Sequence, residues 1–177
     1  MPKVSASYLA ARRRQILDAA GRCFARDGFH RTSMQDIVRE SGISAGLVYR
    51  YFTGKDDVIA AIVDEWHDQR ESIKDAASYL SYLRSVGDPA NASRLRLGVQ
   101  VWAEALRDPA ILALSRRNVD DPRAAAAALL SSAPDPDAMA RVFIAIYQGL
   151  VLQTAWDETV DNEAFVAAVS LLLDQLI

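Results

Sequence analysis

The sequence predicts an all-α protein with an N-terminal helix-turn-helix domain and a larger helical body. Apolar residues recur at helical spacing along the 177-residue chain, and no segment alternates with period two for long enough to form a strand. A tight turn, Ser41-Gly42-Ile43, separates two short helical patterns near the N-terminus. Basic residues gather around this turn, whereas the rest of the chain is acidic.

The first predicted helix covers residues 8–27 and places Ile16 and Phe24 on one apolar face. Gly28 follows as a stop, because glycine readily takes the positive φ that ends many helices. The second helix is expected to begin near Ser33, since Ser33-Met-Gln-Asp36 fits a capping box.

The third predicted helix covers residues 44–51. It opens with the hydroxyl of Ser44 and two small residues, and it closes on Tyr-Arg-Tyr. Small residues allow a helix backbone to come close to a DNA groove, and the residues at its end can bind phosphates. The pattern therefore predicts a helix-turn-helix that binds DNA.

Charge supports this interpretation. Residues 1–55 contain ten Lys and Arg and four Asp and Glu, a net charge of +6. Residues 56–177 contain ten basic and nineteen acidic residues, a net charge of −9. The alternative is an ordinary solvated surface, but the positive end coincides with the turn motif, which favours binding of a polyanion there.

The body is predicted as a series of further helices. One begins at Thr53-Gly-Lys-Asp56 and reaches Ser72 or beyond, so that it links the basic end to the body. The others are expected over residues 76–86, 93–106, 109–130, 137–156 and 163–177, with a break at 133–136, for about nine helices in all.

The last two predicted helices are apolar on more than one side. Such helices must be covered on more than one side, and in a small protein a second copy of the chain is the simplest cover. The alternative is a helix enclosed in a monomeric bundle. The residues expected at the dimer interface are Ile144, Val151, Phe165, Val169, Leu172 and Leu176.

Several other classes of protein are disfavoured. The single cysteine, Cys23, cannot form an internal disulfide and lies on an apolar helix face, so a buried, inert thiol is expected. The N-terminus lacks a signal-peptide core, and no run of about 18 apolar residues is free of charge. We therefore expect a cytoplasmic protein with no membrane partner. No phosphate loop, nucleophile elbow or metal-spaced Cys/His cluster is present, so neither an enzyme nor a metal or cofactor is expected.

Residues 12–63 resemble a known DNA-binding domain. The matching elements, in chain order, are Ile16, Ala20 and Phe24, then Gly28-Phe29, Thr32-Ser33, Ile37, Gly42-Ile43-Ser44, and Leu47 to Phe52 leading to Lys55. Together they are similar to the DNA-binding domain of the tetracycline-repressor (TetR) family of bacterial transcription regulators. The resemblance implies a helix-turn-helix domain over residues 1–54 and an effector-binding and dimerisation domain over residues 55–177.

The resemblance also implies roles for individual residues. Tyr49, Tyr51 and Lys55 would hold phosphates, assisted by Thr32 and Ser33 at a helix N-terminus. Arg50 could read guanine or hold a phosphate, and the basic run 12–14 could enter a minor groove or form an unstructured tail. The expected DNA-binding residues are Arg14, Thr32, Ser33, Ser44, Ala45, Gly46, Leu47, Tyr49, Arg50, Tyr51 and Lys55.

The predicted body contains several large aromatic residues that suit an apolar pocket for a small effector. Aromatic residues at helical spacing are more often core, and that alternative applies to each of them. The candidates are Trp66, Tyr79, Tyr82, Trp102, Phe143 and Tyr147.

The functional hypothesis is a ligand-responsive transcriptional repressor. As a homodimer it would bind a palindromic operator in double-stranded DNA, and a small apolar or aromatic effector would release it. The alternative is a DNA-anchored helical scaffold whose body binds a protein partner instead of a small molecule.

Overall fold

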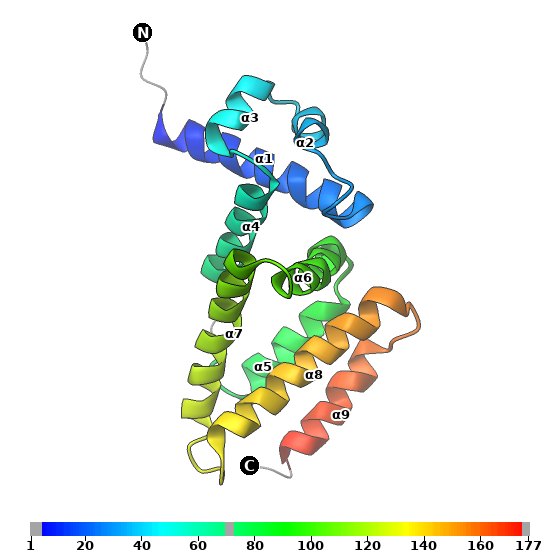
Figure 1. Ribbon diagram of the computed structural model, residues 1–177. Coiled ribbons are helices and arrows are strands. Elements are labelled where there is room, and N and C mark those ends of the chain that lie inside the picture. Colours follow the sequence, from blue (N-terminus) through cyan, green and yellow to red (C-terminus); the bar gives the residue numbers. More distant parts are fainter. Residues whose placement is uncertain (1–4, 70–72, 175–177) are drawn as a thin grey trace. The chain divides into compact units, whose positions relative to one another are not determined.

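The computed structural model describes residues 5–69 and 73–174, and within them the chain forms nine α-helices, two short 3₁₀-helices and no strand (Figure 1). This confirms the predicted all-α fold. The α-helices are α1 (Ala6–Asp27), α2 (Met34–Ser41), α3 (Ala45–Tyr51), α4 (Lys55–Gln69), α5 (Ala76–Arg84), α6 (Ala92–Ala105), α7 (Pro109–Leu129), α8 (Pro136–Trp156) and α9 (Asn162–Asp174). The 3₁₀-helices η1 (Ser85–Gly87) and η2 (Pro89–Asn91) connect α5 to α6.

Local capping explains where the first helices begin and end. The Ser5 hydroxyl accepts a hydrogen bond from the Tyr8 amide at 3.2 Å and so caps the N-terminus of α1. Gly28 ends α1 with φ +84°, a conformation that residues with a side chain rarely adopt. Aspartates that precede a proline, at Asp108 and Asp135, cap α7 and α8 in the same manner.

The chain divides into two compact units, residues 1–69 and 70–177. In the first unit, Ile16 and Phe24 of α1 are fully buried, as their spacing predicted. Val58 and Ile59 of α4 are fully buried as well, and α4 packs against α1. Because its apolar face completes the core of the first unit, α4 belongs there, whereas the sequence analysis placed the domain boundary between residues 54 and 55.

The second unit is a bundle of α5 to α9. Helix α7 packs against α6 and α8, and α5 packs against α9. One core cluster joins four of its elements through the buried residues Tyr79, Leu83, Val86, Leu150, Val151, Val166, Val169 and Leu173. The amphipathic patterns of α5, α8 and α9 therefore meet in one cluster, and α6 and α7 contribute further buried residues, among them Leu97, Val101 and Ile111.

Helix α8 is long and apolar enough to cross a membrane by length and composition, with a mean hydropathy of 1.3 over an 18-residue window. Only 17% of that window is buried. Taken alone, one such helix is weak evidence for a membrane span, since helices of soluble proteins meet the same criteria.

Candidate nucleic-acid interface

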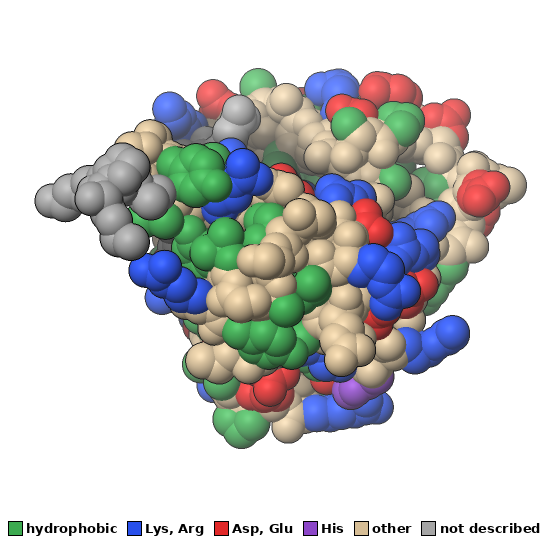
Figure 2. Space-filling model, turned by 90° about the horizontal axis from the view of Figure 1, so that it is seen from above, with side chains coloured by type: hydrophobic (Ala, Val, Ile, Leu, Met, Phe, Trp, Pro, Cys, Tyr) green, Lys and Arg blue, Asp and Glu red, His purple; other side chains and the backbone are tan. Residues whose placement is uncertain are grey.

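Basic side chains of the first unit fall into two groups, those paired with acids and those that are not. Figure 2 shows Lys and Arg side chains interspersed with Asp and Glu over much of the face displayed. Four arginines of α1 and α2 form ion pairs, namely Arg13, Arg22, Arg26 and Arg39. Among the described residues of this unit, Arg14, Arg31 and Arg50 are exposed and form no ion pair.

The turn between α2 and α3 is built from local hydrogen bonds. Gly42 adopts φ +66° and ends α2 in the left-handed region. The Ser41 hydroxyl donates to the Val38 carbonyl at 2.9 Å and accepts from the Ile43 amide at 3.2 Å. The predicted turn Ser41-Gly42-Ile43 is confirmed, and it determines how α3 leaves α2.

Helix α3 has one buried and one exposed side. Val48 and the following Phe52 are 0% and 4% exposed and anchor the helix in the core. The other side carries small and polar residues, of which the exposed ones are Ser44, Ala45, Gly46, Tyr49 and Arg50, with Leu47 half-buried. This is the arrangement that a recognition helix needs, since its anchoring residues and its contact residues do not compete.

Several polar side chains on this exposed side make no interaction within the protein. Within the described part of the chain, the side chains of Tyr49 and Arg50 make no hydrogen bond or ion pair, and Tyr49 is 49% exposed. Ser44 makes no capping hydrogen bond. At Gly46 an added Cβ would meet no atom within 4 Å, so no contact within the protein requires glycine there. Arg14 of α1 is exposed and likewise makes no ion pair among the described residues.

The N-terminus of α2 forms the predicted capping box. The Ser33 hydroxyl accepts from the Asp36 amide at 3.2 Å, and the Asp36 carboxylate accepts from the Ser33 amide at 2.9 Å. The Ser33 hydroxyl and amide, together with Arg39, hold the pKa of Asp36 below its usual range. Thr32, expected to contact phosphate, is only 2% exposed. Its hydroxyl donates a hydrogen bond to the Gly28 carbonyl at 2.8 Å.

Tyr51 and Lys55, also expected to hold phosphates, have partners inside the first unit. The Tyr51 hydroxyl donates to the Leu9 carbonyl at 3.2 Å. The Lys55 ammonium donates to the carbonyls of Phe29 at 2.8 Å and His30 at 3.3 Å. Sequence reasoning could not detect these bonds, because their partners lie 25 to 42 residues away in the chain.

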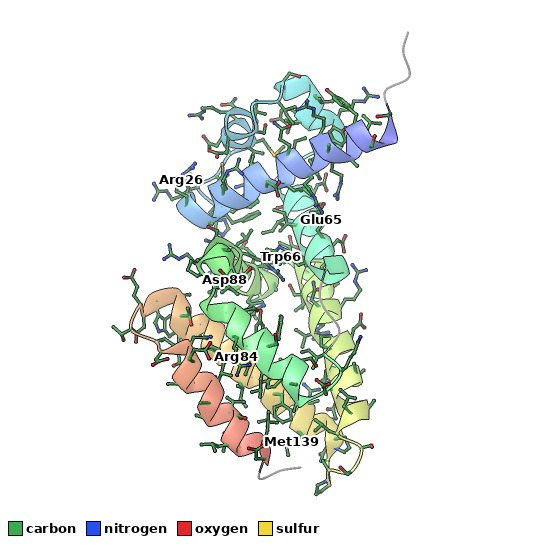
Figure 3. The ribbon with its side chains drawn as sticks, turned by 180° about the vertical axis from the view of Figure 1, so that it is seen from behind. Arg26, Glu65, Trp66, Arg84, Asp88 and Met139 are labelled. Carbon is green, nitrogen blue, oxygen red and sulfur yellow. The ribbon has the colours of Figure 1, made fainter. Side chains whose placement is uncertain are left out.

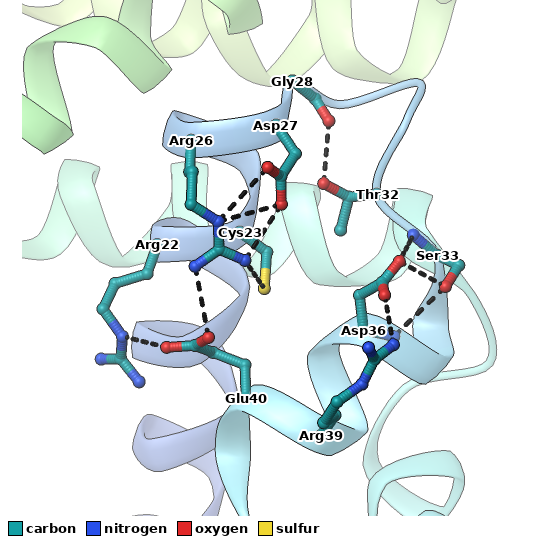
Figure 4. A network of polar contacts seen from close by, with 10 residues as sticks. All are labelled: Arg22, Cys23, Arg26, Asp27, Gly28, Thr32, Ser33, Asp36, Arg39 and Glu40. Carbon is teal, nitrogen blue, oxygen red and sulfur yellow. Dashed lines mark hydrogen bonds and ion pairs between the residues drawn. The ribbon is translucent and has the colours of Figure 1, made fainter.

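A network of ion pairs joins α1 to α2 (Figure 4). Glu40 accepts from Arg22 at 2.8 Å and from Arg26 at 3.4 Å, and Arg26 also pairs with Asp27 at 3.0 Å. The hydrogen bond from Arg22, followed by that from Arg26, lowers the pKa of Glu40. Cys23 is fully buried beneath Arg26, and burial raises the pKa of its thiol, as expected for an inert cysteine.

The candidate effector residues fall in both units. Trp66 lies on α4 of the first unit (Figure 3), and the other five lie in the second. The Tyr79 hydroxyl donates to the Phe143 carbonyl at 2.8 Å, and their rings meet edge to face at 5.3 Å. Tyr82 stacks on Tyr147 at 4.7 Å. Tyr79 belongs to the core cluster, and Trp102, Phe143 and Tyr147 pack against it. Burial raises the pKa of Tyr79.

A surface pocket of about 440 Å³ lies elsewhere in the second unit, and none of the candidate effector residues lines it. Arg84 and Asp88, both visible in Figure 3, form one side of it. Residues 160–163, at the N-terminus of α9, form the other side. Arg84 pairs with Glu163 across it at 3.4 Å. No group of three or more His, Cys, Asp or Glu residues that could hold a metal occurs in the described ranges.

The candidate dimer-interface residues also divide. Val151 and Val169, expected at the interface, are 1% and 4% exposed and pack in the core of their own protomer, so they leave almost no surface for a partner. Ile144 and Phe165 are half-buried, and Leu172 is 54% exposed. Leu176 lies outside the described residues. Exposed apolar residues that the sequence analysis did not select are Val142 and Trp156 of α8 and Leu171 of α9.

Comparison with known proteins accounts for both units. Residues 16–62 match the family described as bacterial regulatory proteins, tetR family, and residues 82–177 match the BetI-type transcriptional repressor, C-terminal, family. The HTH-type transcriptional repressor Rv1474c of Mycobacterium tuberculosis is 35% identical over 86 residues, which cover 49% of this chain and 46% of that protein. The chain thus spans about half the length of this curated relative.

Solved structures share the fold over nearly the whole chain. Salmonella enterica GusR has a TM-score of 0.78 at 24% identity, with 98% of each chain covered. A transcriptional regulator from Saccharomonospora viridis, solved in complex with choline, has a TM-score of 0.74 at 22% identity, covering 93% of this chain and 96% of that one. At these identities the likeness establishes the fold alone.

Proposed function

The chain belongs to the tetR family of bacterial regulatory proteins, and from this premise we propose that it is a repressor which binds a palindromic operator as a homodimer and is released by a small effector. The observation that carries the proposal is the exposed side of α3. There, Ser44, Tyr49 and Arg50 present uncommitted polar groups next to the small residues Ala45 and Gly46. A helix of this composition can enter the major groove with its backbone close to the base edges.

The DNA-binding roles follow from what each side chain is free to do. Arg50 is the long cationic donor of α3 and would contact guanine or a phosphate. Tyr49 would bind a phosphate through its hydroxyl, and the exposed Arg14 would add a contact from α1. Leu47 is suited to apolar contact with a thymine methyl group.

Arg50→Ala is expected to weaken operator binding by about 1–3 kcal/mol, because it removes a charged contact that the rest of the protein does not use. If Arg50 reads a base, preference at one operator position will relax as well. Fluorescence anisotropy on a duplex selected from a randomised pool measures both, and the selected duplexes are expected to share an inverted repeat.

Arg96→Ala is the matched control, since it removes the same charge from an exposed side chain of the second unit that forms no ion pair among the described residues. This control should leave affinity nearly unchanged. Equal losses in the two variants would show that net charge alone matters, and the assignment of α3 as the recognition helix would then be wrong.

Dimerisation would use the outer sides of α8 and α9. Val142 and Trp156 on α8 are 52% and 70% exposed, and Leu171 and Leu172 on α9 are 66% and 54% exposed. Large, solvent-exposed apolar side chains on these two helices are typical of a surface that a partner buries. A second copy would supply such cover, and a dimer could place two α3 helices on half-sites about 34 Å apart.

The effector would bind among the aromatic residues of the second unit, and an apolar or aromatic compound suits them. The regulator from Saccharomonospora viridis holds choline in the same fold, which supports a small-molecule site of some kind here. A ligand at 100 times its Kd stabilises the folded state by about 2.7 kcal/mol, so a thermal-shift screen would detect it.

The screen should include choline and small aromatic compounds. We expect that a compound which raises the melting temperature of the parent chain will no longer raise it in Trp102→Leu. Trp102 packs against the core cluster, whereas Trp156, 70% exposed, is not part of it. Trp156→Leu serves as the control, since leucine keeps an apolar side chain at the proposed dimer interface. Retention of the shift in Trp102→Leu would place the ligand elsewhere.

A further inference from the structure

Lys55, the first residue of α4, uses its ammonium group to hydrogen-bond to the loop between α1 and α2. It donates to the carbonyls of Phe29 at 2.8 Å and His30 at 3.3 Å, and it lies 4.8 Å from the centre of the Phe29 ring. Two carbonyls and one aromatic face thus engage a group that has three N–H donors. All of these contacts are made with two consecutive residues of one loop.

This loop leads directly to the N-terminus of α2. It begins at Gly28, where the positive φ ends α1, and it continues through the buried Thr32 to the cap residue Ser33. Phe29 is 8% exposed and packs on Phe24 of α1 at 5.3 Å, which supports the loop on the side of the core. Lys55 supplies support from α4 through its hydrogen bonds to the Phe29 and His30 carbonyls, which follow the end of α1.

A second contact ties α4 to α1 farther along. Arg13 of α1 pairs with Glu65 of α4 at 2.7 Å, and the Arg13 guanidinium lies 5.7 Å from the centre of the Phe52 ring. Lys55 and Glu65 are ten residues apart, about 15 Å along a helix. Helix α4, on which Figure 3 labels Glu65, is therefore held at two separated points, one in the N-terminal half of α1 and one just beyond its C-terminal end.

From these contacts we propose that Lys55 is a positioning residue for DNA binding: it fixes the α1–α2 loop and so the N-terminus of α2, and it couples that loop to α4. It does not act as a phosphate ligand. The proposal rests on the proposed DNA-binding function. It assigns to Lys55 a role opposite to the one expected from the sequence, in which the ammonium faces the DNA.

The two roles predict different results for Lys55→Met, which keeps the aliphatic stem and removes the donors. In the DNA-free protein, a positioning role predicts that hydrogen exchange at the Thr32 and Ser33 amides becomes about tenfold faster or more, because the loop loses its anchor. Exchange at Ile16 and Ala20, in the centre of α1, should stay unchanged. Lys55→Arg, which restores charge and donors, should restore protection of the loop.

The salt dependence of operator binding provides the second readout. Loss of a phosphate ligand lowers the slope of log affinity against log salt by about one per contact, whereas loss of a positioning residue weakens binding at an unchanged slope. We expect the unchanged slope for Lys55→Met. Unchanged loop exchange with a reduced slope would overturn the proposal, and so would equal acceleration throughout α1.

The hydrogen-exchange result does not depend on DNA. If the parent chain bound no duplex at all, the proposed function would fail while the anchoring of the loop by Lys55 could still be confirmed or refuted.

Discussion

Leu172→Glu is expected to convert the proposed dimer into a folded monomer that has lost most of its operator affinity. Leu172 is 54% exposed in the single chain, so a carboxylate there stays hydrated in the monomer and the fold should survive. In a dimer the same carboxylate would be desolvated without a partner, which costs about 3–5 kcal/mol. Analytical ultracentrifugation at micromolar concentration, with circular dichroism on the same sample, measures both outcomes.

A neighbouring residue on the same helix provides the contrast. Val169→Glu places the same charge at a residue that is 4% exposed and packed in the protomer core, so it is expected to unfold the second unit. Val142→Glu, on the exposed side of α8, should behave like Leu172→Glu. A parent chain that sediments as a monomer and binds a half-site as tightly as a full palindrome would refute the dimer proposal.

Operator affinity is expected to fall steeply with salt. The basic residues of the first unit would neutralise phosphates and release condensed counterions, so log affinity should decrease linearly with log salt. For about 6–10 phosphate contacts in the dimer, the loss between 50 and 200 mM salt is roughly 10³- to 10⁵-fold. Anisotropy titrations across this range measure the slope directly.

Two comparisons make the salt experiment specific. Arg14→Ala removes an exposed arginine without an ion pair in the described region, and it should lower the slope if Arg14 contacts a phosphate. Arg22→Ala removes an arginine already paired with Glu40, and it should change the slope less. An affinity that does not vary with salt in the parent chain would exclude DNA binding through this surface.

Much of the fold follows from local sequence signals. Gly28 takes the positive φ expected of it, Gly42 lies in the expected turn, and Ser33 and Asp36 form the expected capping box. Such signals operate between residues at most a few positions apart, so the sequence is sufficient to determine them. Most helix starts agree with the predicted ranges for the same reason, as α7 illustrates by beginning at Pro109 after the cap Asp108. The predicted end of the fourth helix at Ser72 and that of the last helix at residue 177 lie outside the described residues.

Helical spacing also assigned the two sides of α3 correctly. Val48 and Phe52 are buried, and Tyr49 and Arg50 point outward. A short amphipathic helix with one apolar side has one way to pack, so its exposed polar residues can be predicted from the pattern alone.

The tertiary structure decided what the sequence left ambiguous. Thr32, Tyr51 and Lys55 each have a polar group that could face DNA, but each bonds to a backbone carbonyl of the first unit. A polar side chain is compatible with either arrangement, and only the position of a distant carbonyl determines which one forms.

Helices α8 and α9 show the same limit for apolar residues. Val169 and Leu172 lie three residues apart on one apolar helix, yet the first is buried in its own protomer and the second is exposed. Periodicity identifies which residues are apolar and which share a side, but it does not state which side the rest of the same chain covers. By itself the sequence therefore determined the helices, their caps and the exposed side of α3. The folded chain decided which remaining groups are left for a partner, because long-range packing and hydrogen bonding occupy the others.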